Sequence, residues 1–167
     1  MGLSHKNVDV TAIPKMEVTK LHETEQLKPH IVIYVPAYEQ RLRTLIRLAR
    51  DASIDPVLIT QPALYGDSID LATGVDLGSI RIGSSTGKVH WAILELYNEA
   101  TRKIAEEEKV FVVDLAHELV KSSDYFYDYM HFTNTGSAEV AKIIQLHLTT
   151  YLRQKYPHFR KAQSTGH

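Results

Sequence analysis

The sequence predicts an α/β protein in which helices cover a parallel β-sheet. Two short apolar runs, at 57–60 and 110–113, have the length and composition of strands buried on both faces. A long amphipathic helical pattern precedes each run, and this alternation of helix and buried strand is typical of a parallel sheet. We therefore expect a three-layer α/β/α domain in which only two strands are evident and the first strands are missing or degenerate.

The first helical pattern begins at Pro36, a residue that suits the first turn of a helix. Apolar residues then recur at helical spacing, at Tyr38, Leu42, Leu45, Ile46 and Ala49. Immediately before this pattern, the run IVIYV at 31–35 is a candidate third strand. Residues 1–30 are polar and weakly patterned, and within them we expect only one short helix, near Lys20 to Leu27.

The second half of the chain contains a long loop and two further helices. Residues 61–88 are rich in glycine, proline and small polar residues, which predicts a surface loop. A helical pattern follows from Val89 to Ile104, and a terminal one begins near residue 134, with Thr133, Asn134 and Thr135 as candidate N-caps. The predicted organisation is an irregular segment at 1–30, one α/β domain at 31–156 and a flexible tail at 157–167.

Composition and charge exclude several classes of function. The 19 basic and 20 acidic residues give a net charge of -1, so no overall field attracts nucleic acid or anionic lipid. The absence of cysteine excludes disulfides, thiolate metal sites and a cysteine nucleophile. His117, His131 and His147 are too far apart for a short metal-binding motif, and we expect no metal or cofactor. We find no apolar run that could span a membrane and no secretory signal, which makes the cytoplasm the default location.

Asp128 and His131 form the strongest candidate catalytic pair. They lie three residues apart in a loop before the terminal helix, so the carboxylate can fold back onto the imidazole. A serine hydrolase needs a base of this kind and a carboxylate that orients it. The surrounding aromatic residues are expected to enclose the pair and to lower its dielectric constant. The alternative is that Asp128 only caps a turn and that His131 is an ordinary surface histidine.

Several segments, taken in order, resemble the C-terminal part of the SGNH or GDSL hydrolase superfamily. They are YEQRLRTLIRLARDASIDPVLITQPALYG, LELYNEATRKIAEEEKVFVVDLA and YFYDYMHFTNTG with its following helix. The resemblance extends from about Tyr34 to Leu152. It implies a flavodoxin-like α/β/α sandwich that hydrolyses a small-molecule ester through an acyl-enzyme, with His131 as the general base and Asp128 as its orienting acid.

The same resemblance implies that the nucleophile is missing. In that family the serine follows the first strand in a Gly-Asp-Ser motif, and a glycine and the asparagine of a Gly-x-Asn complete the oxyanion hole. Residues 1–35 contain only Gly2 and Asn7 of these types, in no such setting. We therefore expect a hydrolase that is weakly active or inactive alone, and that associates with itself or with a complementing chain, encoded for example in an adjacent reading frame. The alternative is a non-catalytic binding module derived from a hydrolase.

Two serines nevertheless lie in nucleophile-like patterns. Ser68 ends the Gly-Asp-Ser of YGDS, but it follows its strand by eight residues and no helical pattern comes after it. Ser85 is central in GSSTG, which matches Gly-x-Ser-x-Gly and precedes a helix. Together with Asp114 and His131 it has the chain order of an α/β-hydrolase triad. The alternative for Ser85 is a glycine-rich start of a helix.

Overall fold

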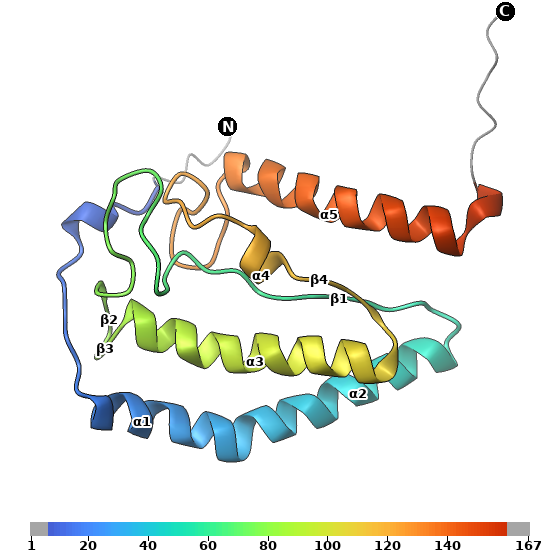
Figure 1. Cartoon of the computed structure of the whole chain (residues 1–167), viewed down its shortest axis with the longest axis horizontal. Helices are drawn as coiled ribbons and strands as arrows, with labels where there is room; N and C mark the ends of the chain where they lie inside the picture. The colour runs from blue at the N-terminus through green and yellow to red at the C-terminus, as the bar shows by residue number, and fades with distance from the viewer. Residues whose placement is uncertain (1–6, 160–167) are drawn as a thin grey trace, which may run out of the picture.

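A two-stranded parallel sheet joins the two apolar runs that the sequence predicts as buried strands (Figure 1). In the computed structural model, which describes residues 7–159, β1 (Val57–Ile59) pairs with β4 (Phe111–Val113), and Leu58 lies opposite Val112. The chain returns between them through a long loop and α3 (Gly87–Glu108), because parallel strands require such a crossover. The predicted α/β class is confirmed.

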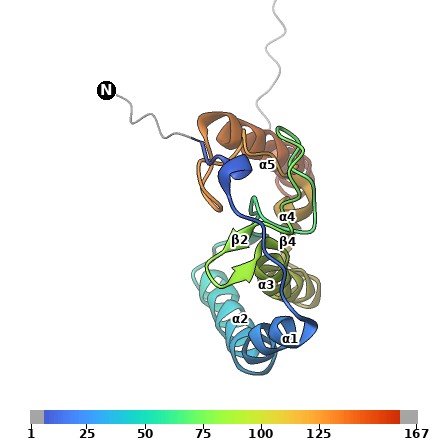
Figure 2. The same ribbon diagram turned by 90° about the vertical axis from the view of Figure 1, so that its left-hand side faces the viewer.

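Helices cover both faces of this sheet (Figure 2). On one face lies α5 (Asn134–Lys155), where the rings of Tyr151 and Phe111 stack with centroids 4.2 Å apart. On the other face lie α3 and α2 (Val35–Asp51). There the side chain of Leu58 packs against a buried cluster of Leu42, Ile46, Ile104 and Val110. Successive side chains of β1 and β4 therefore face apolar residues on opposite sides of the sheet, as expected for a sheet buried on both faces.

A nearly continuous helix occupies residues 20–51, which includes the short helix predicted there and replaces the candidate third strand. It consists of α1 (Lys20–Pro29), a π-helical turn η2 (His30–Tyr34) and α2. The prediction of a strand at 31–35 is therefore wrong, whereas the short helix expected near Lys20 to Leu27 is present as α1. Pro29 has no backbone N–H to donate to the helical ladder, and a widened turn follows it directly.

Contacts with α3 hold this helix in place. The imidazole Nδ1 of His30 lies 2.8 Å from the Tyr97 hydroxyl, and the hydroxyls of Tyr38 and Thr101 are 2.7 Å apart. The apolar run that suggests a strand in the sequence is instead exposed on this π-helical turn. Its exposed side chains are Ile31, Val32, Ile33 and Tyr34.

The remaining elements are short. Residues 9–16 contain a turn of 3-10 helix, η1 (Val10–Ala12), and pair by backbone hydrogen bonds with 79–81. The predicted loop at 61–88 ends in a small hairpin of β2 (Arg81–Ile82) and β3 (Ser85–Thr86). The helix α4 (Leu115–Glu118) follows β4, and η3 (Pro157–Phe159) follows α5. Of the predicted tail, residues 160–167 lie outside the described residues.

Asp70 fastens the long loop to the segment that leads to the candidate catalytic pair. Its buried carboxylate accepts hydrogen bonds from the amide and hydroxyl of Ser123, at 2.7 and 2.8 Å, and from the amide of Thr73 at 3.1 Å. Burial alone would raise the pKa of Asp70, but these hydrogen bonds hold it below its ordinary value. The two segments are therefore joined by an ionised and fully bonded carboxylate.

Replacing this carboxylate is expected to destabilise the fold. Asp70→Ala leaves the buried amide of Ser123 without an acceptor, and the free energy of unfolding should fall by about 3 kcal/mol in urea denaturation at pH 7. Asp67→Ala, in the same loop but exposed, is the matched control and should change it by less than about 0.5 kcal/mol.

The effect of Asp70 should also depend on pH. Because its folded pKa lies below its unfolded value, its stabilisation is present above the unfolded value and is lost as the pH falls through the folded one. The difference in free energy of unfolding between the wild type and Asp70→Ala should therefore become smaller below about pH 4. A difference that persists unchanged to pH 2 would contradict a stabilising role for the ionised form.

Candidate active site

Asp128 and His131 lie in a tight hairpin between α4 and α5. The hairpin is closed by an isolated antiparallel bridge between Phe126 and Phe132 and by a hydrogen bond of 3.0 Å from the Tyr127 amide to the His131 carbonyl. The chain therefore reverses direction within a few residues, and this reversal brings the two candidate side chains together.

The carboxylate of Asp128 contacts both the backbone and the side chain of His131. One oxygen accepts the amides of Met130 and His131 at 2.7 and 2.8 Å, as in an Asx turn. The other oxygen lies 2.7 Å from Nδ1 of the imidazole. The ring of Tyr127 stacks on the other side, nearly parallel to the imidazole, with centroids 5.5 Å apart. Three contacts therefore fix the orientation of one histidine.

This arrangement leaves Nε2 of His131 open to solvent. Nε2 has no hydrogen-bond partner among residues 7–159. Burial raises the pKa of Asp128, but the amides of Met130 and His131 and the adjacent imidazole lower it below its ordinary value. Asp128 is consequently a carboxylate at neutral pH and accepts from Nδ1–H, which places the lone pair of a neutral imidazole on Nε2. This is the geometry of an oriented general base.

The expected aromatic enclosure of the pair does not form. Phe126 is buried in the core, and Tyr129 packs towards Tyr65. Of the aromatic residues in the described part of the chain, only Tyr127 stacks on the imidazole, and the side chain of His131 is 68% exposed. The apolar pattern of this segment therefore anchors the hairpin in the core, and the pair itself remains in a solvent-screened environment.

The N-terminus of α5 supports the hairpin from below. The hydroxyl of Thr133, one of the predicted N-caps, accepts the Gly136 amide at 3.0 Å and donates to the Asp124 carbonyl at 2.7 Å. A Cβ atom at Gly136 would lie 2.0 Å from the carbonyl oxygen of Tyr125, so only glycine permits this approach. A bond of 3.0 Å from the Leu64 amide to the Tyr129 carbonyl ties the hairpin to the loop after β1.

Neither candidate nucleophile is bonded to the histidine. Ser68 lies in a turn, with its amide 2.9 Å from the Gly66 carbonyl, and no helix begins directly after it. Ser85 lies in β3, and its buried hydroxyl has no hydrogen-bond partner among the described residues. Thr86, and not Ser85, caps α3 through its hydroxyl. In the described part of the chain, no hydrogen bond connects either serine hydroxyl to His131.

A second carboxylate–histidine pair lies beyond the carboxyl ends of β1 and β4. Asp114 bonds to the Thr60 hydroxyl at 2.7 Å, to Arg102 at 2.9 Å and to Nδ1 of His117 at 2.9 Å. Asp114 therefore bonds to these partners. The α/β-hydrolase order would require it to bond to His131 instead. The sequence carries a signal for this pair, since Asp114 and His117 repeat the Asp-x-x-His spacing of Asp128 and His131.

The two pairs differ at Nε2. In His117 this nitrogen lies 3.0 Å from the carboxylate of Glu95, so both ring nitrogens are occupied. His147, the third histidine considered for metal binding, contacts Glu118 at 2.7 Å. Of the two Asp-x-x-His pairs, only that of His131 leaves Nε2 without a partner in the described structure.

Sequence reasoning also missed Lys121 near this edge. Its ammonium donates to the Ala63 carbonyl at 2.7 Å and lies 3.5 Å above the centroid of the Trp91 ring. Burial lowers the pKa of Lys121 to about 8. No short motif marks this residue, because its partners come from distant segments. Both of its contacts hold the ammonium against the loop after β1, and they indicate a structural role.

No family model matches the sequence, and no curated protein shows a significant match. Between residues 7 and 159, none of the helices has the length and hydrophobicity needed to cross a bilayer.

The role of Asp128 can be tested through the tautomer of His131. In long-range 15N–1H NMR spectra, the neutral imidazole of the wild type should carry its proton on Nδ1. Asp128→Asn presents an amide donor to the same nitrogen, so the proton should move to Nε2. Asp124→Asn, an exposed change in the same segment, should leave the tautomer unchanged. A wild-type proton on Nε2 would contradict the assignment.

The support from α5 can be tested at Gly136. Gly136→Ala should push the hairpin away from the helix, lower the free energy of unfolding by about 2 kcal/mol and accelerate hydrogen exchange of the Tyr127 amide. Ser137→Ala, at the next and exposed position of the same helix, serves as the control. Equal unfolding free energies and exchange rates in the two variants would show that the close approach of Gly136 to Tyr125 does not stabilise the hairpin.

Proposed function

We propose that this chain is the base-bearing part of an SGNH-type ester hydrolase. The observation that carries the proposal is the Asp128–His131 pair, in which one nitrogen is bound at 2.7 Å by a carboxylate and the other is open. The resemblance of residues 34–152 to that family, which includes this pair, supports the proposal through the order of the surrounding segments. The two-stranded parallel sheet with helices on both faces agrees with a flavodoxin-like sandwich that has lost or lacks its first strands.

The chemistry follows from the orientation of the pair. Nε2 of His131 would take the proton of a serine hydroxyl as its oxygen attacks the carbonyl carbon of an ester. The alcohol then leaves with that proton, and the acyl group stays on the serine. Water, deprotonated by His131 in the same way, releases the acid and restores the serine. Asp128 remains ionised throughout and stabilises the imidazolium that forms in each step.

The serine itself is the missing part in this proposal. Neither Ser68 nor Ser85 bonds to His131, and removal of a triad serine typically reduces kcat about a millionfold. We therefore propose that the isolated chain has very little turnover and that a complementing chain, or a second copy, supplies the nucleophile. The substrate class in this proposal is a small-molecule ester.

A specific observation favours a second candidate function. The outer edge of β1 carries no paired strand among the described residues, and Ile59 beside it is 43% exposed. A fold with an open sheet edge and an incomplete catalytic site is suited to binding another chain. The second candidate is thus a non-catalytic interaction module derived from a hydrolase.

The hydrolase proposal is tested with p-nitrophenyl acetate and butyrate. The wild type at micromolar concentration should hydrolyse these esters only slightly faster than buffer. His131→Gln should remove this residual rate, because Gln cannot accept the proton. His117→Gln is the matched control, since its histidine has the same carboxylate spacing but no open nitrogen, and the rate should persist.

The same assay identifies a nucleophile if one exists in the chain. A rate thousands of times above buffer that is blocked by a fluorophosphonate would contradict the missing serine, and the labelled peptide would name the residue. Ser68→Ala and Ser85→Ala then distinguish the two candidates. If His117→Gln and His131→Gln reduced the residual hydrolysis rate by the same factor, the assignment of His131 as the base would be wrong.

A further inference from the structure

The open edge of β1 presents backbone groups in a defined order. The amide of Thr60 donates to the Val113 carbonyl at 3.1 Å, so Leu58 and Thr60 direct their amides towards β4. In a strand the direction alternates, and Val57 and Ile59 therefore turn their amides and carbonyls away from β4. In the described residues no other strand pairs with β1. Such an edge is a template for a further strand.

An exposed apolar face of α2 accompanies this edge. Leu45, Leu48 and Tyr34 are each about half exposed or more, and with Arg41 they recur at helical spacing on one face. The neighbouring face of α2, through Leu42 and Ile46, packs against Leu58 of β1. A strand added beside β1 would therefore place its inward side chains over the adjacent, exposed face of α2. This exposed face of α2 is hollowed by a groove of about 370 Å³, which is lined by Gln40, Arg41, Thr44 and Leu45.

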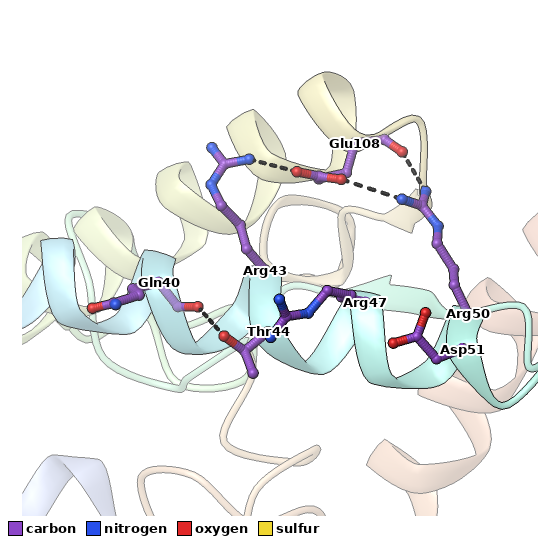
Figure 3. Close-up of a pocket in the computed structure, with 7 residues that line it drawn as sticks. All are labelled: Gln40, Arg43, Thr44, Arg47, Arg50, Asp51 and Glu108. Carbon is purple, nitrogen blue, oxygen red and sulfur yellow. Dashed lines mark hydrogen bonds and ion pairs between the residues drawn. The ribbon is translucent and has the colours of Figure 1, made fainter.

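The charge on α2 indicates what kind of strand would fit. Arg43 and Arg50 both bond to Glu108 of α3 (Figure 3). Arg43 also bonds to Glu107. Arg41 and Arg47 form no ion pair within the described part of the chain. Asp51, which is exposed and likewise forms no ion pair in the described residues, lines the same pocket as Arg47 (Figure 3), so Arg41 is the cation of α2 that has no carboxylate to offset it. In a symmetric dimer through this face the two arginine-bearing helices would approach each other, which is unfavourable.

We propose that the edge of β1 and the adjoining face of α2 bind an extended acidic segment of another protein, which adds to the sheet as a third strand. Its backbone would bond to Val57 and Ile59, its apolar side chains would cover Leu45 and Leu48, and its carboxylates would pair with Arg41. This is recognition by strand addition, in which backbone bonds give affinity and side chains give specificity. The inference goes beyond the ester chemistry and does not depend on it.

The test uses two blocked synthetic peptides with the full chain. One is Glu-Glu-Val-Thr-Val-Thr-Val-Glu-Glu, and the other carries lysine in place of each glutamate. In NMR hydrogen exchange, the acidic peptide should slow the amides of Val57 and Ile59 at least tenfold and leave those of Leu58 and Thr60 unchanged. Its affinity at low salt should exceed that of the lysine peptide at least tenfold.

Two arginine variants separate specific pairing from general charge attraction. Arg41→Glu should weaken binding of the acidic peptide about tenfold. Arg47→Glu is the matched control, because Arg47 is equally exposed and unpaired with described residues but lies on the other flank of α2, and its effect should stay below about threefold. His131→Gln should bind the peptide like the wild type, which separates this test from the test of hydrolysis.

Three results would overturn the proposal. The first is equal affinity for the two peptides, and the second is protection that falls outside β1. The third is a concentration-dependent dimer of the free chain, measured by analytical ultracentrifugation, in which Val57 and Ile59 are already protected. That outcome would assign the edge to a second copy of the chain.

Discussion

The parallel pairing of β1 with β4 is the constraint on which the rest of the structure depends. A parallel pair cannot be closed by a tight turn, so the chain must travel from the end of β1 to the start of β4 through the long loop and α3. Both faces of the pair are apolar, so α5 must cover one and α2 with α3 the other. The loops that follow the two strands then meet at one end of the sheet, where the hairpin of His131 is attached to the loop after β1.

Much of this arrangement could be predicted because its signals are local. The periodicity of α2, α3 and α5 and the apolar runs of β1 and β4 each reflect burial along a single element. The pairing of Asp128 with His131 could also be predicted, since all hydrogen bonds of this pair join residues no more than three positions apart. The N-cap at Thr133 could be predicted for the same reason, because its hydrogen bond to Gly136 is also local.

The failures of prediction involve partners that are distant in sequence. The run at 31–35 reads as a strand by composition, but contacts with Tyr97 and Thr101 of α3 hold the surrounding helix together, and no periodicity could reveal them. The aromatic residues near His131 were expected around the pair, yet Phe126 and Tyr129 pack into the core. Asp114 and His117 share the spacing of the candidate pair, and only the position of Glu95 on α3 shows that this second histidine has no open nitrogen.

The carboxylate of Asp70 has a consequence for the dynamics of the molecule. It connects the loop after β1 to residues 122–123, and the hairpin of His131 follows directly on that segment. Two surface loops that would each fluctuate independently are thus coupled into one cooperative unit, whose opening requires the loss of the same buried bonds. We therefore expect the backbone beneath the hairpin to become accessible to proteases and solvent through one shared opening of both loops, and not through independent opening of either loop.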